Sequence, residues 1–532
     1  MSMSERDRVA AWCEPCAVPR VECRHGDPAQ VGEQHRGQVR IAYRLAAAYS
    51  GRLLHVFELG WFAWDGRRWT EDTGQAQNAV LDVLRAALAE SLDDRELRED
   101  VRRCESDTGI RGVLAVAARL PGVAATLADL DVDPYLLNVA NGTLDLRTMV
   151  LRPHDPTDRL TKVCRAAWTP ENTGGEWCRF LERVLPDADV RDYFRRFVGV
   201  ALLGEVREHV FTIARGVGRN GKGTAYGAIL HALGDYGHTG ERDLFAHAKS
   251  NPNGPSPAML GLRGRRLVVV SETENGARLA PALMKQLTGG DPVTARPLFG
   301  NPVTFNPSHT ALMVTNYLPK LPADDPAVWR RVRVVPFDVV IPPEATDPDL
   351  PDRLRADADA VLSWAITGWV DYRERGGLAE PASVREATAD YERDQDDVSR
   401  FVDVACYVAP GVGETSSALH AAYRRWAEVD GVERPLSLRA FGEALDRLGY
   451  PVRRTKSARL RDGLALLADD DSAVTWTDGE SVTRVTDESQ PSHTRTRKEL
   501  KDSSVTRVTR PMIECPECGD LDCSGECVGG VR

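Results

Sequence analysis

The sequence predicts an α/β fold built around a largely parallel β-sheet. Buried strands are indicated by four short apolar runs, at 209–214, 266–270, 310–316 and 331–337. The segment 224–233 follows the first run, has helical spacing and ends at a glycine suited to a helix C-cap. Short buried strands that alternate with helices are typical of domains with a parallel sheet.

Length and composition limit the classes of protein to which the chain can belong. At roughly 150 residues per domain, a chain of 532 residues should hold three or four domains. Its 42% hydrophobic and 28% charged residues are ordinary for a globular protein. The most apolar stretch, 113–130, contains Arg119 and Pro121, so we expect no membrane association. The N-terminus lacks an apolar signal core, so we expect an intracellular chain whose eleven cysteines are metal ligands or buried thiols.

Charge alone gives little support to a nucleic-acid partner. The chain has 68 basic and 79 acidic residues, a net charge of −11. The segment 453–461 nevertheless contains five basic residues and no acidic one. A local basic surface can bind nucleic acid even when the whole chain is acidic.

The N-terminal part is predicted to be mixed α/β. Residues 1–35 are polar, and Cys13, Cys16, Cys23 and His25 are candidate ligands of a metal site with irregular spacing. The following sequence predicts helices at 39–49 and 75–92, aromatic strands within 55–69 that turn at Asp65–Gly66, and two helices within 176–203.

The strongest chemical signal is GVGRNGKGT, residues 216–224. It fits the pattern G-x-x-x-x-G-K, follows an apolar strand and opens a helix, as a phosphate-binding loop does. Glycines let backbone N–H groups point at phosphates, and Lys222 and the helix N-terminus add positive charge. The predicted ATP ligands are Gly216, Gly218, Asn220, Gly221, Lys222, Gly223 and Thr224. The alternative is a plain glycine turn between strand and helix.

One residue of this loop departs from the usual pattern. The residue after the lysine is normally Ser or Thr and binds Mg²⁺, but here it is Gly223. We therefore expect Thr224, one position later, or a water molecule to contact the metal. The departure affects the predicted metal ligand more than the predicted nucleotide site.

Polar side chains follow the other predicted strands. Glu272 and Glu274 follow the run at 266–270, where a carboxylate can hold Mg²⁺ and polarise an attacking water. Asn316 ends the run at 310–316 and is a candidate to orient that water. Arg330 and Arg331 adjoin the last run, where a guanidinium can reach the γ-phosphate of a neighbouring subunit. The alternative for these arginines is a solvated basic pair.

The order of these motifs resembles that of the superfamily 3 DNA helicases. The succession is GVGRNGKGT, RLVVVSETE, LMKQLTGGDPVTARPLF, VTNYLPK and VWRRVRVVPF, and it is most similar to phage and plasmid primase–helicases with their poxvirus relatives. The segments 133–148 and 151–163 resemble the N-terminal helicase-associated region of that family. The resemblance covers about 40–460. It implies an AAA+-like P-loop ATPase ring, usually a hexamer, that translocates on single-stranded DNA in the cytoplasm of a bacterial host.

The resemblance assigns roles to individual residues. Lys222 matches the Walker A lysine and Glu272 the Walker B acid, although the family often has an acidic pair where this chain has Ser271–Glu272. Asn316 matches the sensor asparagine. Arg330 or Arg331 matches the arginine finger, the arginine that reaches the γ-phosphate of a neighbouring subunit.

The segment 285–296 matches the motif whose following hairpin lines the channel of the ring. The hairpin tip, Gly300–Asn301, has no basic side chain. The candidate DNA contacts in this part are therefore Lys285, Arg296 and Lys320.

Two helices and a basic hairpin near the C-terminus predict a winged helix. Helix 416–429 should bury Leu419, Tyr423 and Trp426, and Ser437 should cap a helix that buries Phe441, Leu445 and Leu448. The candidate phosphate contacts that follow are Arg453, Arg454, Lys456, Arg459 and Arg461. The alternative is a solvated basic loop.

A cysteine cluster ends the chain. Cys515, Cys518, Cys523 and Cys527 have spacing that suits a tetrahedral Zn²⁺ site. Unliganded thiols are the alternative.

These patterns divide the chain into seven regions. They are an N-terminal Cys/His segment (1–35), a helicase-associated domain (36–190), the ATPase core (191–345), a helical extension (346–398), the winged-helix module (399–466), a polar linker (467–513) and the zinc-binding tail (514–532). About 40 residues precede the helicase-associated region, too few for a primase domain, so we expect no primer synthesis by this chain and a separate primase or polymerase as partner.

Different functions stay open. The first is an ATP-dependent helicase that acts on single-stranded DNA as a ring of identical subunits. The second is an origin-binding initiator or loader that ATP switches without unwinding, which Gly223 favours. A nucleic-acid packaging motor is a weaker third.

Overall fold

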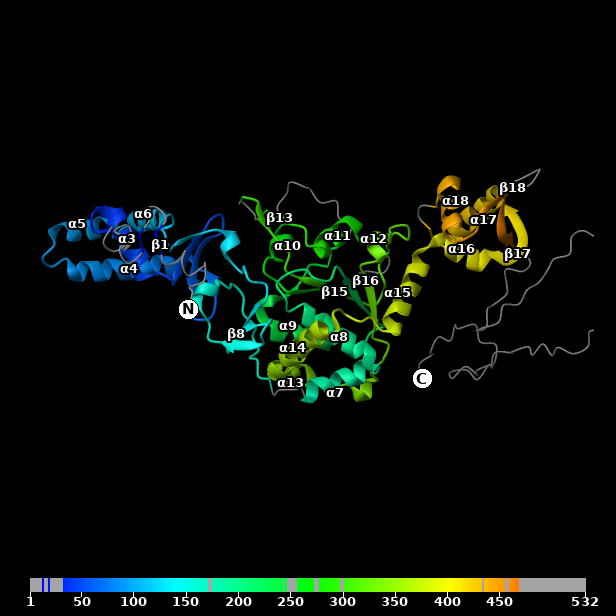
Figure 1. Cartoon of the computed structure of the whole chain (residues 1–532), viewed down its shortest axis with the longest axis horizontal. Helices are drawn as coiled ribbons and strands as arrows, with labels where there is room; N and C mark the ends of the chain where they lie inside the picture. Colours follow the sequence, from blue (N-terminus) through cyan, green and yellow to red (C-terminus); the bar gives the residue numbers. More distant parts are fainter. Residues whose placement is uncertain are drawn as a thin grey trace, which may run out of the picture. The chain divides into compact units, whose positions relative to one another are not determined.

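A computed structural model describes the protein as a mixed α/β structure with several sheets (Figure 1). The described residues are 12–13, 18–19, 32–170, 175–242, 244–245, 256–271, 277–296, 301–432, 435–454 and 459–467. All of them belong to the first of two compact units, 1–467. Apart from its first residue, Leu467, the predicted linker lies outside the described residues, as does the predicted zinc-binding tail.

A five-stranded parallel sheet forms the centre of the described chain. Its order is β11 (Gly237–Thr239), β12 (Leu267–Ser271), β15 (Thr310–Thr315), β10 (Phe211–Arg215) and β16 (Val332–Pro336). Every pairing is parallel, which confirms the predicted parallel sheet. The four apolar runs form β10, β12, β15 and β16. The edge strand β11 was not predicted because its sequence, GHT, is polar and short.

Helices cover both faces of this sheet (Figure 1). Along β12, Val269 packs into one buried cluster, whereas Val268 and Val270 pack into the other, as alternation along a strand requires. The first cluster includes residues of α7 (Gly175–Val184), α8 (Ala188–Val200), α9 (Lys222–Leu233), α13 (Leu350–Ala356) and α14 (Ala358–Arg375). The second includes residues of α11 (Pro281–Gly289), α12 (Pro326–Trp329) and α15 (Ala382–Gln395), and the short helix α10 (Pro257–Leu260) packs against it.

Several predicted helical features are confirmed. The two helices expected within 176–203 are α7 and α8. Gly234 is the C-cap of α9 at a φ of 55°. Trp364 and Trp369 are buried on α14, and Trp369 donates from Nε1 to the backbone oxygen of Leu146 over 2.8 Å.

The N-terminal region combines helices with small sheets. Its helices are α3 (Gly37–Ala48), α4 (Thr73–Glu90), α5 (Arg95–Cys104) and α6 (Asp107–Ala117). One sheet has the order β5 (Trp69–Glu71), β4 (Gly60–Trp64), β3 (Leu53–Val56), β6 (Ala124–Ala125), and another is the antiparallel series β7 (Leu136–Val139), β8 (Gly142–Asp145), β9 (Val150–Arg152). A separate pair is β1 (Trp12–Cys13) with β2 (Val18–Pro19). The predicted helices at 39–49 and 75–92 and the aromatic strands are therefore confirmed.

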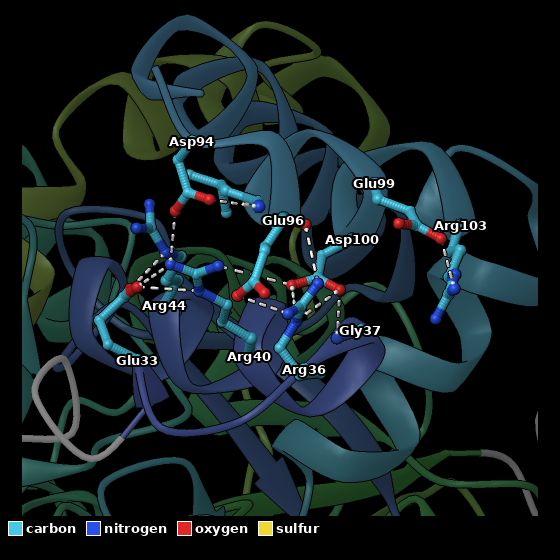
Figure 2. Close-up of polar contacts among 11 residues, drawn as sticks. Glu33, Arg36, Gly37, Arg40, Arg44, Asp94, Glu96, Glu99, Asp100 and Arg103 are labelled. Carbon is cyan, nitrogen blue, oxygen red and sulfur yellow. Dashed lines mark hydrogen bonds and ion pairs between the residues drawn. The ribbon is translucent and has the colours of Figure 1, made fainter. Parts of the chain in front are cut away.

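A buried carboxylate joins α3 to α5 in this region (Figure 2). Asp100, with a fully buried side chain, accepts a hydrogen bond from the backbone N of Gly37 over 2.8 Å, at the start of α3. Its Oδ2 lies 3.2 Å from Nε of Arg36 and 3.5 Å from Nη1 of Arg40. The sequence analysis did not predict this network.

The C-terminal part of the described chain has three helices and a three-stranded sheet. The elements are α16 (Asp397–Ala405), β17 (Cys406–Thr415), α17 (Ser416–Val429), α18 (Leu438–Arg447), β18 (Val452–Arg454) and β19 (Arg459–Leu466). The sheet order is β17-β19-β18, and both pairings are antiparallel. The predicted helix pair is confirmed, and Ser437 accepts from the backbone N of Ala440 over 3.3 Å as the predicted N-cap. Trp426 and Leu448 are half-buried instead of buried, a small correction.

Three of the described cysteines are buried thiols, which is one of the two states expected for the cysteines. Cys104, Cys164 and Cys406 are buried, and Cys178 is half-buried. Within the described ranges, every helix is too short or too polar to cross a lipid bilayer.

Candidate functional site

The glycine loop, residues 216–221, connects β10 to α9 and has an unusual backbone. Gly218, Arg219 and Gly221 have φ values of 98°, 48° and 78°, in the left-handed region that glycine tolerates best. A Cβ atom on Gly216 would collide with the Asn220 side chain and with the backbone oxygen of Phe337. The loop therefore needs glycine both for its turns and for its close packing, as a loop that presents backbone N–H groups to an anion does.

Lys222 begins α9, directly after the loop. Its side chain is almost fully buried, and Nζ donates to the backbone oxygen of Gly216 over 2.6 Å. Burial lowers the pKa of Lys222 to about 8, and the charge of Asp338 opposes this shift. Among the described residues, no carboxylate forms an ion pair with Lys222. A buried ammonium group without a carboxylate is suited to an anionic ligand.

Asn316 lies beside this lysine. Nζ of Lys222 is 3.3 Å from Oδ1 of Asn316, which directly follows β15. The register explains the approach, because Arg215 at the end of β10 is paired with Thr315 at the end of β15. The Thr315 hydroxyl accepts from the backbone N of Tyr317 over 3.1 Å and donates to its backbone oxygen over 2.7 Å, which turns the chain at Asn316.

Asn220 bonds the loop to the chain just beyond β16, the strand on the other side of β10 from β15. Its Nδ2 donates to the backbone oxygen of Phe337, just beyond β16, over 3.0 Å. Its Oδ1 accepts from the backbone N of Lys222 over 3.4 Å. The backbone N of Ile341 donates to the oxygen of Arg219 over 2.7 Å. The sequence analysis did not predict that the backbone of Phe337 and Ile341 holds the loop. No local pattern links Asn220 with Phe337, which is 117 positions away.

The predicted metal ligands are only partly described. Gly223 is exposed, and Thr224 is half-buried beside a cavity next to the loop. Glu272 and Glu274 lie outside the described residues, although β12 ends at Ser271, next to β15. The described residues contain no group of three or more His, Cys, Asp or Glu side chains able to hold a metal ion. The two predicted cysteine clusters, Cys515 to Cys527 and the set from Cys13 to His25, are not covered by that search.

The two candidate finger arginines have different environments. Arg330 follows α12 and is exposed, and its Nε donates to the backbone oxygen of Pro326 over 3.3 Å. Arg331 is half-buried and donates from Nη1 to the oxygen of Ala327 over 2.8 Å. Arg330 is thus the more accessible of the two.

The candidate DNA contacts of the core come from separate elements. Lys285 on α11 forms an ion pair with Asp325, with 2.8 Å between Nζ and Oδ2. Arg296 follows β13 (Val293–Ala295), which pairs antiparallel with β14 (Val303–Phe305), as the predicted hairpin requires. Lys320 is exposed after β15. The tip residue Gly300 is not described.

The basic residues near the C-terminus differ from one another. Arg454 is exposed on β18, and Arg453 pairs with Asp462 over 3.0 Å. Lys456 lies outside the described residues. Arg461 is only 4% exposed, bonded to Ser416 and Asp446 and to the backbone oxygens of Gly442 and Tyr450. The prediction that Arg461 contacts phosphate is therefore wrong, because its guanidinium is used inside the fold.

Comparison with known proteins shows which family the chain resembles. A family model described as "D5 N terminal like" matches residues 42–186. A protein of Acanthamoeba polyphaga mimivirus named "Putative helicase" is 26% identical over 323 residues, which are 57% of this chain and 34% of that protein. The chain is therefore similar to the D5-like primase–helicases.

Other relatives of this chain also come from large DNA viruses. A protein of African swine fever virus named "Putative primase" is 26% identical over 43% of this chain and 24% of its own length. A "Putative helicase" of Frog virus 3 is 28% identical over 48% of this chain and 28% of its own length. The chain spans about a third or less of the length of these relatives. The resemblance to primase–helicases noted in the sequence is thereby confirmed.

Proposed function

We propose that this chain is an ATP-dependent DNA helicase that acts in replication of a phage or mobile element. It works as a ring, a hexamer by family resemblance, that translocates on single-stranded DNA. One observation carries the proposal: Nζ of Lys222 contacts Oδ1 of Asn316 beside the glycine loop. The contact lies where the adjacent parallel strands β10 and β15 end. Ligands of parallel α/β sheets bind at this edge. Similarity to proteins named putative helicase and putative primase supports the proposal further.

The residues of the loop fit a triphosphate. Its backbone N–H groups and the start of α9 contact the phosphates, and Lys222 supplies the positive charge that no described carboxylate neutralises. Thr224 or water holds Mg²⁺, which when bound neutralises charge on the phosphates. Glu272 activates the attacking water, with Glu274 as the second candidate, and Asn316 orients it.

Hydrolysis is completed by a neighbouring copy of the chain. Arg330 is the favoured finger because it is exposed, whereas Arg331 is half-buried against α12. A guanidinium that approaches the γ-phosphate stabilises the charge of the transition state. The ring is therefore needed for catalysis as well as for enclosing DNA.

The C-terminal helices and hairpin serve as a winged helix that binds DNA. The element order helix, strand, two helices and a hairpin supports this proposal. Arg453, Arg454 and Lys456 contact phosphates there, while Lys285, Arg296 and Lys320 are the candidates in the core. Phosphate contacts of this kind position DNA without reading its sequence.

The test is hydrolysis of ATP by the purified full chain with and without single-stranded DNA. We expect stimulation by DNA, and loss of hydrolysis in Lys222→Ala. Arg355→Ala is the control, because Arg355 is an exposed residue of α13 whose ion pair within the described part of the chain is with Asp352. Equal hydrolysis rates with and without DNA would contradict the helicase proposal.

The ATP-switched initiator or loader is the second candidate. Gly223 favours it, because a hydroxyl normally placed to bind Mg²⁺ for hydrolysis is absent and the site there is open. Strand displacement on a forked duplex separates the two functions. A helicase separates the strands, whereas a loader binds origin DNA and leaves them paired.

A further inference from the structure

The segment 317–329 connects two residues that the proposed function places in different ATP sites. It begins after Asn316, which follows β15, and ends before Arg330, which follows α12. Leu321 and Trp329 of this segment are buried in the cluster to which α15 also contributes. Asn316 serves the ATP site of its own subunit, whereas Arg330 serves that of the next subunit. The packing of this segment therefore bears on two sites at once.

Two side chains of α15 hold the first half of the segment. Tyr391 is almost fully buried, and its hydroxyl donates a hydrogen bond to the backbone oxygen of Pro319. Burial raises the pKa of Tyr391, so the hydroxyl stays a neutral donor. Gln395, one turn further along α15, accepts from the backbone N of Leu321 with Oε1 over 3.0 Å. Side chains four positions apart share one face of a helix, so this face of α15 fixes the backbone that follows Asn316.

Trp329 of α12 holds the second half of the segment. Its Nε1 donates to the backbone oxygen of Pro322 over 3.0 Å. Its ring packs edge-on against the ring of Tyr391, with 5.1 Å between the ring centroids and 77° between the planes. Arg330 is the next residue of the chain, and its backbone N donates to the oxygen of Pro326 over 3.1 Å. The place of the indole in the core thus determines where the candidate finger starts.

The two aromatic side chains make the segment move as one unit. A shift of the backbone after Asn316 moves the oxygens of Pro319 and Pro322 relative to the buried groups that donate to them. Buried polar groups keep their hydrogen bonds, so Trp329 follows such a shift. Packed cores change between discrete arrangements and do not deform continuously, which carries a small shift over the whole segment. The shift would start at the phosphates, because Asn316 lies 3.3 Å from Nζ of Lys222.

We propose that Tyr391 and Trp329 are positioning residues that couple Asn316 in the ATP site of one subunit to Arg330, which acts on the ATP of the next subunit. The inference rests on the proposed function and specifies which contacts link successive sites of the ring. The phosphates beside Asn316 set the position of the segment 317–329, and the segment sets the position of the finger. Occupancy of one site then alters the rate of hydrolysis in the next site.

The first test is steady-state ATP hydrolysis by the full chain with Tyr391→Phe, which keeps the ring and removes the hydroxyl. We expect kcat to fall at least about fivefold and KM to change less than about twofold, because Asn316 and Arg330 act on the transition state. Tyr236→Phe is the matched control and should leave both constants unchanged. Tyr236 is also buried, and its hydroxyl accepts from the backbone N of Asn138 over 3.3 Å in the other buried cluster. An unchanged kcat in Tyr391→Phe would overturn the inference.

Mixed rings test the link between sites. Lys222→Ala subunits added to the wild-type chain should reduce hydrolysis by more than their share, because a defective site leaves the next finger misplaced. When all subunits also carry Trp329→Phe, the loss should be proportional to that share, and Gln395→Ala repeats the test without changing the aromatic pair. Trp369→Phe is the control, because Trp369 is buried and donates to the backbone oxygen of Leu146 over 2.8 Å in the other cluster. A proportional loss in the wild-type mixture would overturn the inference and leave the proposed function standing, whereas a wild-type chain without ATP hydrolysis would contradict the proposed function itself.

Discussion

Asn220 donates from Nδ2 to the backbone oxygen of Phe337, so the glycine loop is bonded to the end of β16. The same strand begins one residue after Arg331. One five-residue strand therefore connects the loop with the segment that carries both candidate finger arginines. The bond is buried, because Asn220 is only 3% exposed.

Replacing Asn220 with alanine should loosen the loop. The variant leaves the oxygen of Phe337 without this donor, and we expect a loss of about 1–3 kcal/mol in the free energy of unfolding. ATP affinity should fall as well, because the backbone N of Lys222 also loses a partner. Urea unfolding with and without nucleotide measures both effects. Asn141→Ala is the control: Asn141 forms two 3.0 Å bonds with Trp168 but is exposed, so its loss should leave ATP affinity unchanged.

The affinity for ATP should depend on pH through Lys222. With a pKa of about 8, the side chain of the nucleotide-free protein is charged below pH 8 and neutral above it. Phosphates bind the charged form, so affinity should fall as the pH rises from 8 to 10, and binding there should take up a proton. Titrations across this range measure the change. Lys222→Arg, which stays charged, should show a flatter profile, and identical profiles would count against the role of Lys222.

Arg461 and Arg454 should behave oppositely when changed to alanine. Arg461→Ala removes a buried guanidinium from Asp446 and two backbone oxygens, so we expect the C-terminal part to lose about 3 kcal/mol of stability. Arg454→Ala, at an exposed position, should change stability by less than about 0.5 kcal/mol and weaken DNA binding. Thermal unfolding and DNA titration at fixed salt concentration measure the two effects. A stable Arg461→Ala protein with weaker DNA binding would restore the original prediction for this residue.

The network around Asp100 gives a matched pair of neighbours. Asp100→Ala leaves Arg36, Arg40 and the start of α3 without their shared acceptor, which should cost about 3 kcal/mol. Glu99→Ala removes only an exposed pair with Arg103 and should cost less than about 0.5 kcal/mol. Figure 2 shows that both residues belong to the same helix. Chemical unfolding of the two variants tests whether burial decides the difference.

The main elements of the fold were predictable because their signals are local. Apolar runs indicated β10, β12, β15 and β16, and Ser437 and Gly234 marked helix ends. The edge strand β11 and the long strand β17 gave no such signal, since one is polar and the other contains proline and glycine. The sequence could not predict the order of the strands in the sheet, because that order depends on pairings between residues about a hundred positions apart.

The sequence predicted which residues form the candidate site but not the contacts that hold them in place. The motif indicated Lys222 and the strand end indicated Asn316, and the register of β10 and β15 brings the two together. The sequence could not show that Phe337 and Ile341 hold the loop, because backbone oxygens and N–H groups leave no mark on residue type. It also could not show which arginines of a basic hairpin point inward, since alternation along a strand depends on its register.

The buried position of Arg461 changes how the electrostatic surface of the C-terminal part should be counted. Of the basic residues between 453 and 461, Arg461 is buried and holds α17, α18 and β19 together, and Arg453 forms an ion pair with Asp462. The number of phosphates that this hairpin can neutralise is therefore smaller than its sequence indicates. The slope of binding affinity against salt concentration should be correspondingly shallow.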